Sequence, residues 1–76
     1  MRIPFNFDAQ ADAAYLKLLD GVTGRSSDQR SIAVPDRGEI VLDFNLEGHL
    51  VGIEVIGARE LLPPELLGSG GSQIGA

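Results

Sequence analysis

Apolar and polar side chains alternate with a period of two along most of the chain up to residue 56. This alternation is typical of β-strands with one buried face, because successive side chains point to opposite sides of a sheet. For residues 13–19 a strand is favoured over a helix, since so short a helix would not be stable alone, although Ala, Leu and Lys also suit a helix. The pattern predicts five strands: Arg2–Asp8, Ala13–Leu19, Ser31–Val34, Glu39–Phe44 and Leu50–Ile56.

Turn-forming residues separate these segments. Asp8–Asp12 is predicted to be a polar turn, because aspartates readily bond nearby backbone amides. Asp20–Arg30 contains two glycines and is predicted to be a loop. Pro35–Gly38 reads as a β-turn with Pro first and Gly last, and Asn45–Gly48 as a type I turn with Gly48 in a left-handed conformation. Segments that follow one another are therefore expected to pair.

The C-terminal part changes character. Ala58–Leu62 can form one helical turn, and Pro64–Leu67 a second with Pro64 at its first position. Four leucines in these turns could cover one face of the sheet: Leu61, Leu62, Leu66 and Leu67. The predicted fold is α+β and mainly β, a small antiparallel β-meander of three to five strands with short C-terminal helical turns on one face. Residues 1–67 form the single domain, and the Gly/Ser-rich residues 68–76 a disordered tail.

Composition narrows the functional classes. With 76 residues the chain can form only one small domain, and without cysteine it has no disulfide, thiol nucleophile or thiolate metal site. The formal charge of −5 argues against binding nucleic acid. No apolar run approaches the ~20 residues of a membrane span, and no signal peptide is recognisable. We expect a cytoplasmic domain whose partners are neither nucleic acids nor membranes.

Recognisable catalytic motifs are lacking. The single histidine, His49, lies beside a turn glycine with no second histidine or cysteine near it in sequence, so a structural or solvated role is favoured. No G-x-S-x-G nucleophile motif occurs, and Gly21–Gly24 lacks the lysine of a phosphate-binding loop. We assign no catalytic residue, no metal ligand and no cofactor.

Two acidic residues, Asp43 and Glu54, stand inside predicted strands, where Asp and Glu are uncommon. With a two-residue hairpin loop they share one sheet face with Val41 and Gly52, whereas a one-residue bulge at Gly48 would change that register. Both registers stay open. The two-residue loop would pair Phe44 with His49, Asp43 with Leu50, and Glu39 with Glu54, and would place Ile40, Leu42, Val51 and Ile53 on the other face.

Two carboxylates on one face could act as an acid/base pair or bind a divalent cation, with Asp12 as a third group. Alternatively they pair with Arg37 or Arg59, or accept bonds from turn amides. We favour this structural role, because structural ion pairs are commoner than functional sites.

Asp8, Asp12 and Tyr15 form a second group of polar residues near the N-terminus. For Asp8 and Asp12 turn capping is favoured over a metal loop, because the D-x-D-x-D-G spacing of a calcium loop is missing. Tyr15 alternates with Lys17 on one strand face, as expected of an amphipathic residue at the core edge rather than of a catalytic phenol.

These residues belong to two longer strings, Asp8-x3-Asp12-x2-Tyr15-Leu16 and Asp43-x4-Gly48-x-Leu50-Val51-Gly52-Ile53-Glu54-Val55. Together they resemble a small prokaryotic family, the domain of unknown function 2283, over roughly residues 5–62. Phe7 stands where the family often has Tyr, and Asn45 where it often has Asp, which removes a carboxylate near Asp43. The resemblance implies a compact, mainly β domain of bacteria or archaea without an assigned activity. Some members resemble partners of small toxin-like proteins, which implies an antitoxin or interaction role.

Three functional hypotheses follow. The first is a non-enzymatic protein-interaction module, antitoxin-like, binding a small basic protein, because the acidic charge biases encounters toward positive surfaces. The second is a small metal- or ligand-binding domain or hydrolase that uses Asp43 and Glu54. The third is a structural, self-assembling domain. A homodimer is expected in addition, because so small a core rarely supplies more than ~3–5 kcal/mol and exposed edge strands favour pairing.

Overall fold

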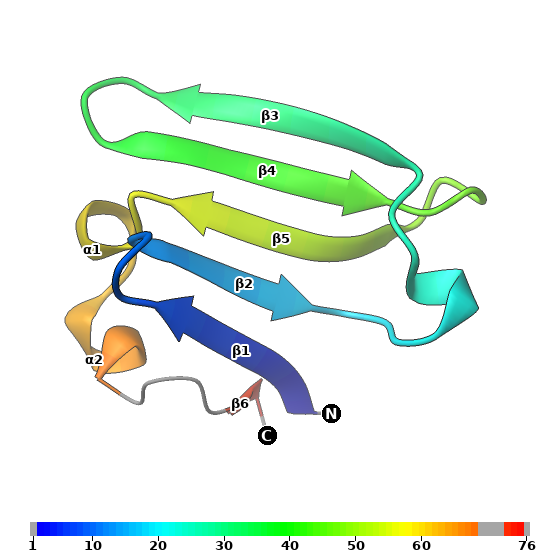
Figure 1. Ribbon diagram of the computed structural model, residues 1–76, viewed down its shortest axis with the longest axis horizontal. Helices are drawn as coiled ribbons and strands as arrows, with labels where there is room; N and C mark the ends of the chain where they lie inside the picture. The colour runs from blue at the N-terminus through cyan, green and yellow to red at the C-terminus, as the bar shows by residue number, and fades with distance from the viewer. Residues whose placement is uncertain (1, 69–72, 76) are drawn as a thin grey trace.

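The computed structural model, which describes residues 2–68 and 73–75, shows a single antiparallel sheet with two short helical turns at one end (Figure 1). This confirms the predicted fold class, including a strand rather than a helix after the first turn. The elements in chain order are β1 (Arg2–Asp8), β2 (Ala13–Lys17), a 3-10 turn (Val22–Gly24), β3 (Asp28–Val34), β4 (Gly38–Phe44), β5 (Leu50–Ile56), α1 (Ala58–Leu61), α2 (Pro64–Leu67) and β6 (Gln73–Gly75).

The strand order across the sheet is β3-β4-β5-β2-β1-β6. Strands that follow one another pair as predicted in β1–β2, β3–β4 and β4–β5, but β2 does not pair with β3. Instead β5 returns to lie between β4 and β2. The connection from β2 to β3, seen at the right of Figure 1, is long enough to pass the ends of the two intervening strands. Among strands β1–β5, the last in sequence, β5, is thereby the central one.

The register of β4 and β5 differs from the two-residue-loop prediction by two residues. Asp43 pairs with Gly52 and Glu39 with Ile56, whereas Phe44 pairs with Leu50, so one extra residue, Val51, lies between these pairs. The Asn45 amide donates to the His49 carbonyl across a three-residue loop in which Gly48 has a φ of 84°. The bulge at Gly48, which the sequence left open, is therefore present as well. The hairpin loop shifts the register by one residue and the bulge by another. A shift of two leaves the side chains of residues 52–56 on their predicted faces, because side chains alternate with a period of two. Leu50 lies beyond the bulge and faces Phe44 instead of Asp43.

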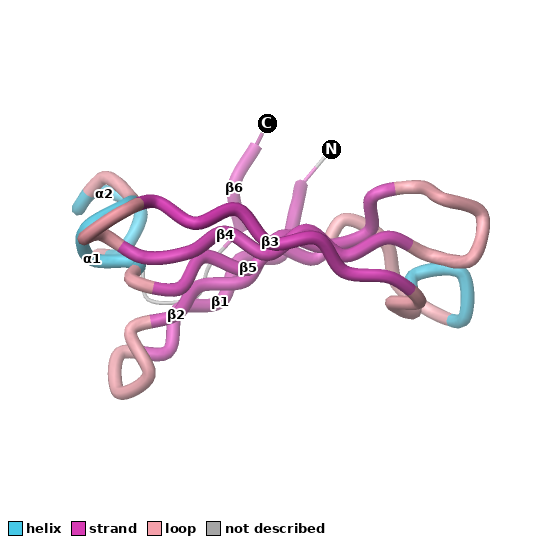
Figure 2. Tube along the Cα trace, turned by 90° about the horizontal axis from the view of Figure 1, so that it is seen from above, coloured by secondary structure: helices cyan, strands magenta, loops and turns pink. Residues whose placement is uncertain are grey.

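The core lies on one side of the sheet, which we call the helix-covered face. Its fully buried residues are Phe5, Ala14, Val55 and Ala58. The four leucines of the helical turns pack against this group, as predicted, together with Phe7, Leu16 and Ile53. The opposite side, which we call the polar face, carries the alternate residues of the same strands. Figure 2 shows the sheet edge-on, with α1 and α2 at one end.

Two boundaries differ from the sequence prediction in the hairpin that joins β3 to β4. Strand β3 begins at Asp28, not at Ser31, because Gln29 pairs with Asp43 and polar residues are tolerated on an edge strand. The turn is shifted by one residue. The amide of Arg37 donates to the carbonyl of Val34 at 3.0 Å, which makes Pro35 the second residue of the turn.

The predicted disordered tail lies partly outside the described residues, namely at 69–72 and 76. Gln73–Gly75 differ from the prediction, because they form β6 and pair with the first half of β1, residues 2–4. An edge strand leaves backbone donors and acceptors unpaired, and β6 pairs with those in the first half of β1. Within the described residues, no helix has the length and apolarity needed to cross a membrane.

Candidate functional site

The polar face brings together four residues from the two strings singled out in the sequence. Tyr15 on β2 lies directly opposite Glu54 on β5, and Gly52 on β5 lies opposite Asp43 on β4. Because cross-strand partners share a face, Asp43, Glu54, Gly52 and Val41 lie on one face as the sequence predicted. Tyr15 joins them because β5 pairs with β2, a contact that sequential strand pairing did not predict.

Asp43 is the most enclosed carboxylate on this face, with only 6 % of the residue exposed. The Tyr15 hydroxyl donates a hydrogen bond to its Oδ2 at 2.9 Å, and the Gln29 amide donates one to its Oδ1 at 2.7 Å. The expected partners, an arginine or turn amides, are therefore wrong for Asp43, although the carboxylate does have hydrogen-bonded partners. The Tyr15–Asp43–Gln29 chain connects β2, β4 and β3 across β5.

Gly52 makes this connection sterically possible. A Cβ atom at this position would lie 1.9 Å from the Tyr15 hydroxyl oxygen and 3.3 Å from Asp43 Oδ2. The tyrosine side chain therefore crosses β5 at the one strand position that lacks a side chain. Glycine weakens a strand interior and often marks such a close approach. Its place in the Val-Gly-Ile-Glu string has a direct geometric cause.

The surroundings of Tyr15 favour its protonated form. Burial, the hydrogen bond to Asp43, and the negative charges of Asp43 and Glu54 together raise the pKa of Tyr15 to about 12. A phenol with this pKa is neutral and a hydrogen-bond donor throughout the physiological range. Tyr15 therefore suits a structural donor, and its environment is the reverse of one that would make it a general base.

Glu54 has a different environment from Asp43. It is partly exposed, and within the described residues its carboxylate forms neither a hydrogen bond nor an ion pair. Glu39 lies on the same face, diagonally across the β4–β5 pair from Glu54. In the described part of the chain, His, Asp and Glu side chains nowhere gather in a group of three that could hold a metal ion. Asp12 lies at the first turn and does not join Asp43 and Glu54.

Asp12 instead caps helix α1 from outside the helix. The N-cap position of α1 is Gly57, which has no side chain to accept a bond. The Asp12 carbonyl accepts the amides of Gly57 and Ala58 at 2.9 and 3.0 Å, and its Oδ1 accepts the amide of Arg59 at 2.9 Å. Asp12 therefore caps the start of α1, which lies far away in sequence, and not the first turn that the sequence predicted.

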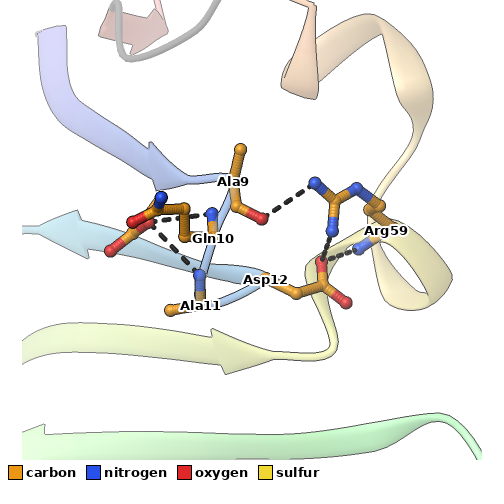
Figure 3. A network of polar contacts seen from close by, with 6 residues as sticks. Ala9, Gln10, Ala11, Asp12 and Arg59 are labelled. Carbon is orange, nitrogen blue, oxygen red and sulfur yellow. Dashed lines mark hydrogen bonds and ion pairs between the residues drawn. The ribbon is translucent and has the colours of Figure 1, made fainter.

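Arg59 fastens the first turn to the same helix (Figure 3). Its guanidinium forms an ion pair with Asp12 at 3.5 Å, donates to the carbonyl of Ala9 at 2.8 Å, and lies 5.5 Å from the ring centre of Phe7. Asp8 shapes the turn locally, since its Oδ1 accepts the amides of residues 10 and 11. The expected pairing of Arg59 with Asp43 or Glu54 is therefore wrong, because Arg59 pairs with Asp12.

Asn45 organises the opposite end of the sheet. Its Oδ1 accepts the amides of Glu47 and His49, and its Nδ2 donates to the carbonyl of Thr23 at 2.8 Å. Gly48 closes the predicted turn with a φ of 84°, and its backbone amide donates a hydrogen bond to the Asn45 carbonyl. An aspartate at position 45 could not donate to Thr23. A shallow hollow of about 430 Å³ lies here, lined by Thr23, Arg25, Ser26, Ser27, Asn45, Leu46 and Glu47, away from the polar-face carboxylates.

Two sets of contacts, which we call braces, thus join the first hairpin to the rest of the domain. One is the Tyr15–Asp43 hydrogen bond, which links the two strings. The other joins Asp12 of the first string to residues 57–59, which follow the second string. A family model described as a protein of unknown function, DUF2283, matches residues 5–59, more than half of the chain. The chain belongs to the DUF2283 family. No curated protein and no solved structure matches it. In this DUF2283 domain Asp12 and Tyr15 of the first string contact the second half of the chain.

Sequence reasoning missed three residues of this arrangement. Gln29 was placed in a loop, and its bond to Asp43 has no signal in the local pattern. Arg59 was considered only as a partner for Asp43 or Glu54. Asn45 was regarded as the loss of a carboxylate, although its amide makes a bond that a carboxylate cannot make.

Proposed function

We propose that this DUF2283 domain is a non-enzymatic protein-interaction module, and that its polar face binds a small basic protein. The observation that carries the proposal is that the helical turns leave this face uncovered and that two of its carboxylates are partly exposed. The helical leucines pack on the other side of the sheet, and on the polar face Glu39 and Glu54 are partly exposed next to Tyr15. A sheet face with partly exposed carboxylates suits a macromolecule better than a small substrate, which usually binds in a concave pocket.

The hydrogen bonding of Asp43 supports a structural role over a catalytic one. Both of its oxygens already accept bonds from neutral donors of the domain itself. A cation or a substrate proton would have to reach a carboxylate that is almost fully enclosed and already accepts two hydrogen bonds. Glu54 lacks such bonds and remains available to a donor from outside.

Charge supports a basic partner. The chain carries six basic and eleven acidic residues, and among the described side chains of the polar face on β2, β4 and β5 only Lys17 is cationic. Lys17 itself pairs with Asp20 at 3.8 Å. An acidic surface accelerates encounter with a positive one, and this effect falls when salt shortens the Debye length from ~10 Å at 0.1 M to ~3 Å at 1 M.

Affinity capture from the native source tests the proposal with two matched charge reversals. One double variant carries Glu39→Lys and Glu54→Lys on the polar face. The control carries Glu60→Lys and Glu65→Lys on the helical turns, where both residues are exposed and the net charge changes equally. We expect parent and control to retain the same basic protein, released by salt, and the polar-face variant to lose it. Equal retention by both variants, with unfolding curves showing that both are folded, would contradict the proposal.

A further inference from the structure

The two edges of the sheet differ in whether a further strand pairs with them. The outer side of β1 carries β6 along residues 2–4. Strand β3 at the opposite edge pairs only with β4, so its other side has no neighbour among the described residues. Six of its seven residues are exposed, and it contains neither proline nor a bulge. Its two charged residues, Asp28 and Arg30, lie in its first half and form an ion pair with each other at 3.4 Å, so residues 31–34 carry no charge. Natural proteins usually protect such an edge by one of these devices or by a covering element.

An apolar row runs into this edge on the helix-covered face. Ile32 on β3 lies opposite Ile40 on β4, which lies opposite the core residue Val55 on β5. The row begins in the core, and it ends at Ile32, whose residue surface is 51 % exposed. A large β-branched side chain at the end of a row that begins in the core is well placed to continue that row into another strand.

We propose that a second copy of this chain pairs its β3 with β3 in antiparallel orientation, about a two-fold axis at Ile32. Ile32 of one copy then lies opposite Ile32 of the other, and the apolar row becomes continuous from core to core. On the polar face the register places Ser31 opposite Ala33, two small residues. Arg30 lies opposite Val34 on the helix-covered face.

Charge favours this register over its neighbour. A two-fold axis at Ser31 would place Ile32 opposite Arg30 and would bring the two Arg30 side chains diagonal to each other. An axis at Arg30 would place these two arginines directly opposite, which is destabilising. Of the axes at Arg30, Ser31 and Ile32, only the axis at Ile32 joins apolar to apolar residues and keeps the arginines apart.

A second copy fits this edge better than an unrelated strand, because the same surface is used on both copies. The assembly then ends at two copies. A two-fold interface uses the same surface on both subunits, so the pairing consumes the unprotected edge of each copy. The outer edges of the joined sheet are then the two β1 strands, each carrying its own β6. The two polar faces lie on the same side of the joined sheet, and pairing through the β3 edges covers neither of them. The dimer can therefore form whether or not the polar face binds a basic protein.

Sedimentation equilibrium of the full chain tests the association. We expect a parent of twice 8.0 kDa at tens of micromolar. Ile32→Lys should halve the observed mass, whereas Ile56→Lys should not, although Ile56 is the same residue type and is 38 % exposed on the polar face. A parent that stays monomeric up to hundreds of micromolar, or an Ile32→Lys variant that is folded and still dimeric, would overturn the proposal.

Cross-linking tests the register, and the absence of native cysteine makes it unambiguous. Opposed residues in an antiparallel pair have Cα atoms ~4.5–5.5 Å apart, within the range that a disulfide spans. Ile32→Cys should form a covalent dimer under mild oxidation. Ser31→Cys, opposite Ala33 in this register, should cross-link much more slowly, and Ile56→Cys serves as the background. Faster cross-linking of Ser31→Cys than of Ile32→Cys would overturn the Ile32 axis.

Discussion

The Tyr15 hydroxyl and Asp43 Oδ2 are 2.9 Å apart, although the residues come from strands β2 and β4, which do not pair with each other. The bond passes over Gly52 on the intervening strand. It joins the N-terminal hairpin to the β3–β4–β5 unit independently of the backbone ladder. The two parts of the domain are therefore connected by side chains as well as by the β2–β5 pair.

Removing the Tyr15 hydroxyl should destabilise the domain. Tyr15→Phe leaves Asp43, which is almost fully enclosed, with one bond in place of two. An unsatisfied buried acceptor costs ~1–3 kcal/mol, and we expect a loss of that order in the free energy of unfolding measured in urea. Gln29→Ala should cost less, because Gln29 is exposed and water can replace its amide. A larger loss for Gln29→Ala than for Tyr15→Phe would contradict this account of the brace.

Adding a methyl group at position 52 should break the same bond sterically. Gly52→Ala places a Cβ atom where the Tyr15 hydroxyl lies, so the ring must move away from Asp43. In a double-mutant cycle with Tyr15→Phe the two losses should be non-additive by more than ~0.5 kcal/mol, because both changes remove one interaction. Additive losses in unfolding experiments would show that Gly52 acts through something other than Tyr15.

The titration of Tyr15 gives a direct spectroscopic signal, because it is the only tyrosine and the chain has no tryptophan. Ultraviolet absorbance should report a pKa of about 12, against 10.0 for an ordinary tyrosine. The raised pKa of the folded state contributes stability that is complete below pH 10 and is lost as the pH rises from 10 toward 12. Asp43→Asn should lower the Tyr15 pKa more than Glu54→Gln does, since Asp43 contributes both a bond and a charge. The opposite order would contradict the assigned causes.

The capping of α1 by Asp12 predicts a clear difference between two substitutions. Asp12→Asn keeps a side-chain acceptor for the Arg59 amide and tolerates the positive φ of 52° at this position, so its effect should be small. Asp12→Ala loses the acceptor. It also places alanine in a left-handed conformation without the short polar side chain by which Asp and Asn tolerate it. We expect a loss of ~1 kcal/mol or more in the free energy of unfolding for Asp12→Ala. Equal stability of the two variants would argue against the cap.

The strands of this domain were predictable because one face is buried, which imposes a two-residue alternation that local sequence displays. The face shared by Asp43 and Glu54 was predictable for the same reason. It did not depend on the hairpin loop, because the loop and the bulge at Val51 together shift the register by two residues. Strand Asp28–Val34 shows why the bounds of an edge strand are harder to predict. Its first three residues are polar and exposed, so they show no alternation of apolar and polar side chains.

The partners of the polar residues were not predictable, because they depend on strand order. Tyr15 reaches Asp43 only because β5 lies beside β2, and Asp12 reaches Arg59 only because β5 ends next to the first turn. Nothing in the local pattern around Tyr15 or Asp12 specifies that return of the chain.

Chemical-shift mapping tests the central claim, that the polar face is the binding surface for a basic partner. The nitrogen-labelled parent is titrated with an unstructured, lysine-rich peptide at low salt. The account predicts that the shifted amides cluster around Tyr15, Glu39 and Glu54 and that added salt reverses the shifts. Shifts that cluster instead on α1 and α2, where Glu60 and Glu65 are equally acidic, or that spread evenly over the molecule, would contradict it.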